Sequence, residues 1–96
     1  MKVRFLKAGK SELKEAVSYY DEQQAELGDA FLDEIDAAIK AIQDFPKAHA
    51  LITRDIRRIR TKRFPYSLVY KVYESEIIIV AVMHEKRKPG YWQDRV

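Results

Sequence analysis

The chain has 96 residues and a net charge of +3, with 47% hydrophobic residues, 34% charged residues and no cysteine. This length and composition predict one globular domain over residues 1–96 and exclude a disordered chain. The lack of cysteine excludes disulfide bonds and thiolate chemistry, and the longest apolar run, residues 77–83, is far shorter than the roughly 20 residues that span a membrane. We therefore expect a cytoplasmic protein.

The first half of the chain predicts one short strand followed by two helices. Residues 3–7 read as the strand, and a helix begins after a cap at Ser11 and ends at Gly28, with apolar side chains at spacings of three, four and seven. Asp29 caps a second helix, which ends before Pro46. Because the link between the two helices is short, they should form an antiparallel hairpin whose acidic residues face solvent.

The second half changes to a periodicity of two, which is typical of strands. Three strands are predicted at residues 56–62, 66–73 and 77–83, and the last is apolar on both faces, so it should be central. The order β-α-α-β-β-β predicts an α+β fold, an antiparallel sheet with the helical hairpin packed on one face.

Charge is distributed unevenly along the chain. Residues 1–48 contain seven Lys/Arg and ten Asp/Glu, whereas residues 49–96 contain eleven and five, so the two halves carry net charges of −3 and +6. A positive second half is suited to steering an anionic partner, although a solvated surface would have the same composition.

The predicted strand 56–62 carries a row of cations, and the tail after residue 84 carries cations together with the aromatic residues Tyr91 and Trp92. Guanidinium groups bind phosphate and aromatic rings stack on bases, so this mixture suits single-stranded nucleic acid, and it suits an acidic protein surface equally well. The residues that we expect to contact such a target are Arg57, Arg58, Arg60, Lys62, Arg63, Lys86, Arg87 and Trp92.

Signs of other chemistry are few. The sequence has no metal-ligand spacing, glycine-rich phosphate loop or nucleophile motif, so we expect no metal and no cofactor. His49 is interpreted as a loop residue. His84 ends the apolar strand beside several cations, which would favour its neutral form as a base, although a hydrogen bond to the backbone at the strand end is the alternative. Tyr91 and Trp92 could likewise pack the tail onto the sheet.

Two motifs carry a family resemblance. They are "FPYSLVYKV", residues 64–72, and His84-x-x-Arg87-x-Pro89-x-Tyr91-Trp92, which follows the apolar strand. Together with the basic strand before them, they resemble the second half of the RelE/ParE superfamily, the toxins of type II toxin–antitoxin modules that are also labelled plasmid stabilisation proteins. The helical hairpin with its Leu-Gly-x-x-Phe link resembles the first half.

The resemblance implies a toxin with a cognate antitoxin partner, in a possible hetero-oligomer, and leaves open whether the toxin is an enzyme. RelE-like members cut messenger RNA on the ribosome without a metal, and an arginine of that family is replaced here by Ser67. This replacement favours a ParE-like toxin that binds DNA gyrase; a degenerate, non-toxic antitoxin-binding module is a further alternative. If the chain is a ribonuclease, the resemblance assigns the catalytic roles to Arg58, Arg60, His84, Arg87 and Tyr91.

Every version of this hypothesis needs one geometric arrangement. The guanidinium groups of the strand at residues 56–62 and those of the tail after residue 84 should converge on one side of the sheet.

Overall fold

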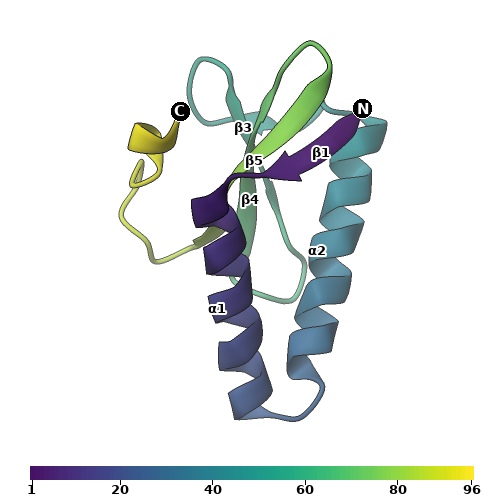
Figure 1. The fold of residues 1–96 in the computed structure, drawn as a ribbon, viewed down its shortest axis with the longest axis vertical. Coiled ribbons are helices and arrows are strands. Elements are labelled where there is room, and N and C mark those ends of the chain that lie inside the picture. Colours follow the sequence, from purple (N-terminus) through teal and green to yellow (C-terminus); the bar gives the residue numbers. More distant parts are fainter.

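The computed structural model describes residues 1–96 as two helices lying against a five-stranded sheet (Figure 1). The strand order is β1-β5-β4-β3-β2, and the predicted α+β class with a helical hairpin on one face is confirmed. Neither helix is both long and apolar enough to cross a membrane. The elements are β1 (Lys2–Phe5), α1 (Lys7–Gln23), α2 (Leu27–Asp44), β2 (Ala50–Leu51), β3 (Ile56–Arg60), β4 (Tyr66–Val72), β5 (Glu76–His84) and the 3₁₀ turn η1 (Gln93–Arg95).

The sheet is mixed rather than wholly antiparallel, which corrects one detail of the prediction. Strands β2, β3, β4 and β5 pair antiparallel in sequence order, but β1 runs parallel to β5, with Phe5 opposite Ile79. An alternation of period two shows which residues face the core but is the same for parallel and antiparallel neighbours, so the sequence could not give this direction.

The joint between the helices also differs from the prediction. Helix α1 begins directly after Leu6, four residues before the expected cap at Ser11, and the left-handed residue of the link is Glu26. Gly28 instead lies in the first turn of α2, where its N–H donates to Asp21 Oδ1 at 2.9 Å. A Cβ at position 28 would overlap the Asp21 carboxylate, so this glycine permits a close approach between the helices.

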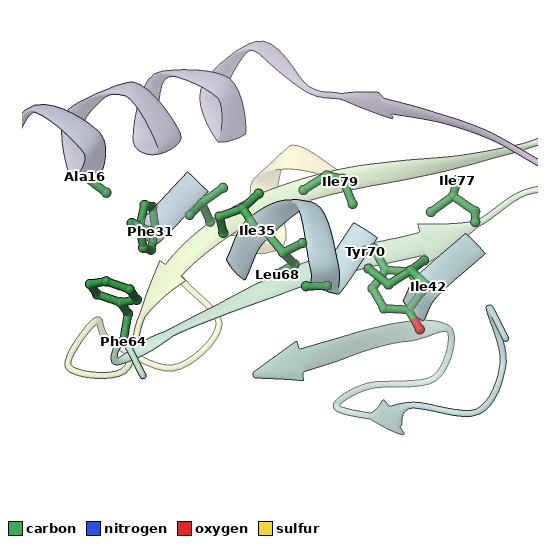
Figure 2. Packing of buried hydrophobic residues seen from close by; sticks show 11 residues of the cluster. Ala16, Phe31, Ile35, Ile42, Phe64, Leu68, Tyr70, Ile77 and Ile79 are labelled. Carbon is green, nitrogen blue, oxygen red and sulfur yellow. The ribbon is translucent and has the colours of Figure 1, made fainter. Parts of the chain in front are cut away.

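The main core lies between the helical hairpin and the sheet (Figure 2). Phe31 is fully buried and its ring makes edge contacts with Phe64 and Tyr66, at centroid distances of 5.2 and 5.0 Å. The rest of this core comes from the helix-facing side of β4 and β5, including Leu68 and Ile79. This packing makes the sheet a rigid support for side chains on its other face.

A second, smaller apolar cluster lies on the other face of the sheet. Its members are Ile56, Val69, Val80, Ala81, Met83 and Trp92. The chain beyond β5, green-yellow to yellow in Figure 1, therefore packs back on the sheet through Trp92, which is 3% exposed. Beside this cluster the face stays open, and Arg58 and Arg60 of β3 project there.

Candidate functional site

A cavity of about 590 Å³ opens on the face of the sheet that the helices leave uncovered. Its wall includes Arg58 and Arg60 of β3 and Ser67 of β4, which lies opposite Arg60 in the sheet. The segment after β5 closes the other side. The full lining is Ile52, Thr53, Arg58, Arg60, Ser67, Met83, Glu85, Arg87, Pro89, Gly90, Trp92 and Gln93.

The charge of this basic cavity is only partly neutralised. Arg58 is exposed and belongs to no ion pair, whereas Arg60 Nη1 contacts Glu85 Oε2 at 3.0 Å with both side chains about half exposed. Glu85 is the single carboxylate among lining residues that include three arginines. A site with this excess of guanidinium groups suits an anionic group of a partner.

Arg87 is the arginine that the C-terminal segment contributes to the cavity. Its guanidinium lies over the Tyr91 ring at 3.8 Å, and its Nη1 is 3.9 Å from Glu12 Oε2. The expected convergence of strand and tail cations is therefore present for Arg58, Arg60 and Arg87.

The other predicted cations lie elsewhere. Arg57 points to the opposite side of β3 and donates to the His49 carbonyl at 2.8 Å. Strand β3 ends at Arg60, so the expected alternation does not reach Lys62, which borders a separate cavity beside α2. Arg63 stacks near the Phe64 ring, and exposed Lys86 is not among the lining residues.

The Glu34 side chain binds the turn that carries Lys62 and Arg63. The sequence predicted a solvated carboxylate, but its Oε1 accepts the backbone N–H groups of Lys62 and Arg63 at 2.8 and 2.9 Å. This carboxylate ties the β3–β4 turn to α2.

Trp92 lines the basic cavity but is only 3% exposed, so little of its side chain is free to contact a target. Its side chain is buried in the second cluster beside Met83 and Val80. This position matches the alternative interpretation, in which Trp92 packs the tail onto the sheet.

His84 does not line the basic cavity. It lines a second cavity of about 240 Å³, and Arg87 lines both cavities. Its Nδ1 accepts the Lys86 N–H at 3.0 Å, and its ring meets the Tyr66 ring edge-on at 5.0 Å. This arrangement matches the backbone-bonding alternative for a histidine at a strand end.

Tyr91 is held by a carboxylate that the sequence did not single out. Its hydroxyl donates to Glu12 Oε2 at 2.7 Å. Burial and this hydrogen bond raise the pKa of Tyr91 well above its ordinary value, so the phenol stays protonated. Its O–H group is already engaged as the hydrogen-bond donor to Glu12.

Glu12 is the functional neighbour that sequence reasoning missed. It stands four residues before Ala16 and eight before Tyr20, in line with the apolar stripe of α1, and this position was the available signal. Burial alone would raise the pKa of Glu12, but hydrogen bonds from Arg95, Tyr91 and the Val82 amide outweigh burial, so the pKa of Glu12 lies below its ordinary value.

The hairpin, the mixed sheet and the basic cavity define a small α+β domain with a cationic surface on one face of its sheet. Residues 3–89 match the family described as "ParE toxin of type II toxin-antitoxin system, parDE", so the chain belongs to the ParE toxin family and is a ParE-type toxin of a type II toxin–antitoxin system. The expected RelE/ParE resemblance is thereby confirmed.

A solved structure described as "Chromosomal ParDE TA system from P. aeruginosa" has the same fold. It superposes with a TM-score of 0.76 at 18% identity, covering 88% of this chain and 95% of that one. No curated protein sequence matches the chain.

Proposed function

We propose that this ParE-type toxin arrests growth in the cytoplasm by binding a nucleic-acid-handling target, with DNA gyrase as the first candidate. The observation that carries the proposal is the convergence of three arginines on one cavity that neither His84 nor Tyr91 lines. The target approaches the open face of the sheet and places an anionic group between Arg58, Arg60 and Arg87.

Binding is favoured over RNA cleavage by the state of the other candidate catalytic residues. Ser67 stands where the resemblance places a ribonuclease arginine, and it is 4% exposed. The Tyr91 hydroxyl is bonded to Glu12, and His84 lines a different cavity. Cleavage requires an acid and a base within hydrogen-bond reach of the reacting atoms, so this set favours recognition.

RelE-like cleavage of messenger RNA remains the second candidate because the arginines of strand and tail do share one cavity. Guanidinium groups so arranged are also suited to the charge of a phosphoryl transition state. A non-toxic antitoxin-binding module is the third candidate.

A cognate antitoxin is the expected partner that neutralises the toxin. Two observations support this partner: the membership of the ParE family and the likeness to a structure described as a ParDE system. An antitoxin segment that is acidic or amphipathic and folds on binding would complement the charge of the basic cavity. A hetero-oligomer of toxin and antitoxin follows from this proposal.

The test uses purified toxin in two assays, gyrase supercoiling and transcript integrity on ribosomes. Gyrase inhibition with intact transcripts is expected for wild type. Arg58→Ala should weaken inhibition about tenfold, since one charge-assisted contact contributes about 1–3 kcal/mol. The matched control is Arg54→Ala, which removes the same charge from an exposed position outside the cavity and should inhibit like wild type.

Two outcomes contradict the gyrase proposal, and a third contradicts the assigned contact site. Cut transcripts with unaffected supercoiling would select the RelE-like candidate, and expression without growth arrest would select the non-toxic module. Equal loss of potency in Arg58→Ala and Arg54→Ala would show that the basic cavity is not the contact site.

A further inference from the structure

The outer edge of β5 is paired along only part of its length. Strand β1 ends opposite Ile79, and the Leu6 N–H donates to the Ile79 carbonyl at 2.9 Å. From Val80 to His84 no strand lies on that side. Exposed strand edges with free N–H and C=O groups are normally covered in folded proteins.

Two side chains take the place of the missing strand. Glu12 Oε1 accepts the Val82 N–H at 3.0 Å, and Arg95 Nη1 donates to the Val80 carbonyl at 3.1 Å. One side chain comes from α1 and the other from η1, so this edge joins parts of the chain more than 80 residues apart in sequence.

The same Glu12 carboxylate fastens the C-terminal segment, residues 86–96. Arg95 donates to Glu12 Oε1 from Nη1 at 2.8 Å and to Oε2 from Nη2 at 3.0 Å, and Tyr91 donates to Oε2 at 2.7 Å. The Glu12 side chain is 13% exposed. Partial burial makes these charge-assisted hydrogen bonds stronger than they would be in water.

The position of Arg87 depends on this fastening. Its guanidinium rests on the Tyr91 ring, whose hydroxyl is bonded to Glu12, and its Nη1 lies 3.9 Å from Glu12 Oε2. Trp92 anchors the backbone of the segment in the second cluster, against which the Tyr91 side chain also packs.

We propose that Glu12 is a positioning residue of the basic cavity. By binding Tyr91, Arg95 and the edge of β5 together, it holds Arg87 at the cavity beside Arg58 and Arg60, although Glu12 does not line that cavity. Its contribution to growth arrest rests on the proposed function, whereas its hold on Arg87 does not.

The first experiment measures that hold directly by NMR in Glu12→Ala and in a matched control. Glu15→Ala removes an exposed carboxylate of the same helix that makes no hydrogen bond or ion pair. The Arg87 Nε–H group should be ordered in wild type and Glu15→Ala and should become mobile in Glu12→Ala, with unchanged backbone amide signals in β3 and β4. Trp92 is the single tryptophan, so its emission reports in the same samples whether the segment stays docked.

Tyr91→Phe provides a second route should Glu12→Ala fail to fold. It keeps the ring under Arg87 and removes only the bond to Glu12, so the Arg87 Nε–H group should gain mobility while the fold is retained. An Arg87 side chain as ordered in these variants as in wild type would overturn the proposal.

The second experiment compares potency against the target. Glu12→Ala should weaken inhibition as much as Arg87→Ala does, and the double variant should be no weaker than Arg87→Ala alone, because both changes remove the same contact. Additive losses would overturn the positioning role. A wild-type protein that inhibits nothing would refute the proposed function, and the NMR result would still decide whether Glu12 holds Arg87.

Discussion

Arg57 and Arg58 are neighbours on β3, yet their side chains have opposite surroundings. Arg57 is bonded to the His49 carbonyl on one side of the strand, and Arg58 is exposed at the basic cavity on the other. Alternation in a strand explains the difference, because successive side chains point to opposite faces. A count of cations therefore overstates the binding surface, and only every second residue of the basic strand can contribute to one site.

Phe31 is the residue whose loss should damage the core most. It is 0% exposed and its ring contacts those of Tyr20, Phe64 and Tyr66. Replacing a buried phenylalanine by alanine removes apolar contacts and leaves a cavity, so Phe31→Ala should lower the free energy of unfolding by about 3–5 kcal/mol. Urea unfolding followed by far-UV circular dichroism measures this change.

Phe45→Ala is the matched control for that substitution. Phe45 lies just beyond α2 and is 68% exposed, so its replacement should change the free energy of unfolding by less than about 0.5 kcal/mol. Similar losses in the two variants would show that Phe31 does not occupy the core as described.

The helical hairpin depends on a bond between its two members. Helix α2 starts at Leu27 with no cap from its own N-cap residue, Glu26, and the N–H of Gly28 is bonded instead by Asp21 of α1. Helix N-termini leave several N–H groups without intrahelical partners, so this carboxylate acts as a cap from the neighbouring helix.

Asp21→Ala should therefore destabilise the protein by about 1 kcal/mol, the usual contribution of a helix cap. Its control is Glu22→Ala, an exposed carboxylate of the same turn that makes no hydrogen bond to α2. Urea unfolding of both variants gives the comparison. Equal stability of Asp21→Ala and wild type would mean that water replaces the carboxylate without loss.

Most elements could be predicted because each follows a local pattern. The apolar spacing on α2 and the period-two runs of β4 and β5 locate these elements to within a few residues. The start of α1 was missed because Ser11 looks like a cap, while the chain actually enters the helix from β1 at Leu6 without any side-chain cap. Strand β2 has only two residues, Ala50 and Leu51, too few to show a period.

At the scale of the whole molecule, the site could be predicted only in part from the sequence. Arg58, Arg60 and Arg87 were predicted to meet, since the first two share a face of β3 and the third follows β5, which is separated from β3 by β4 alone. The position of Glu12 on the apolar stripe of α1 indicated burial but not its partners, because Glu12 is 75 residues before Arg87 and meets it only in the folded chain. Long-range contacts of this kind follow from topology and leave little local signal.

The Glu12 connection also predicts how stability depends on pH. Because the pKa of Glu12 is lowered in the folded protein, the unfolded chain binds its proton more readily. The stabilisation is thus fully present above the ordinary pKa of a glutamate, about 4.3, and is lost as the pH falls through the lower pKa of the folded state. The pKa of Glu76 is lowered as well, through its bond to Arg4, and it adds to the same trend.

Glu12→Gln isolates the part of this trend that belongs to Glu12. The amide keeps the shape of the side chain but cannot carry the charge that Arg95 and Arg87 face, so the variant should be less stable than wild type by about 1–3 kcal/mol at pH 7. The difference should shrink as the pH falls below about 4, since protonated Glu12 resembles the amide. Urea unfolding at pH 7 and pH 3 measures it, and a difference that stays constant over this range would show that the charge of Glu12 does not hold the C-terminal segment.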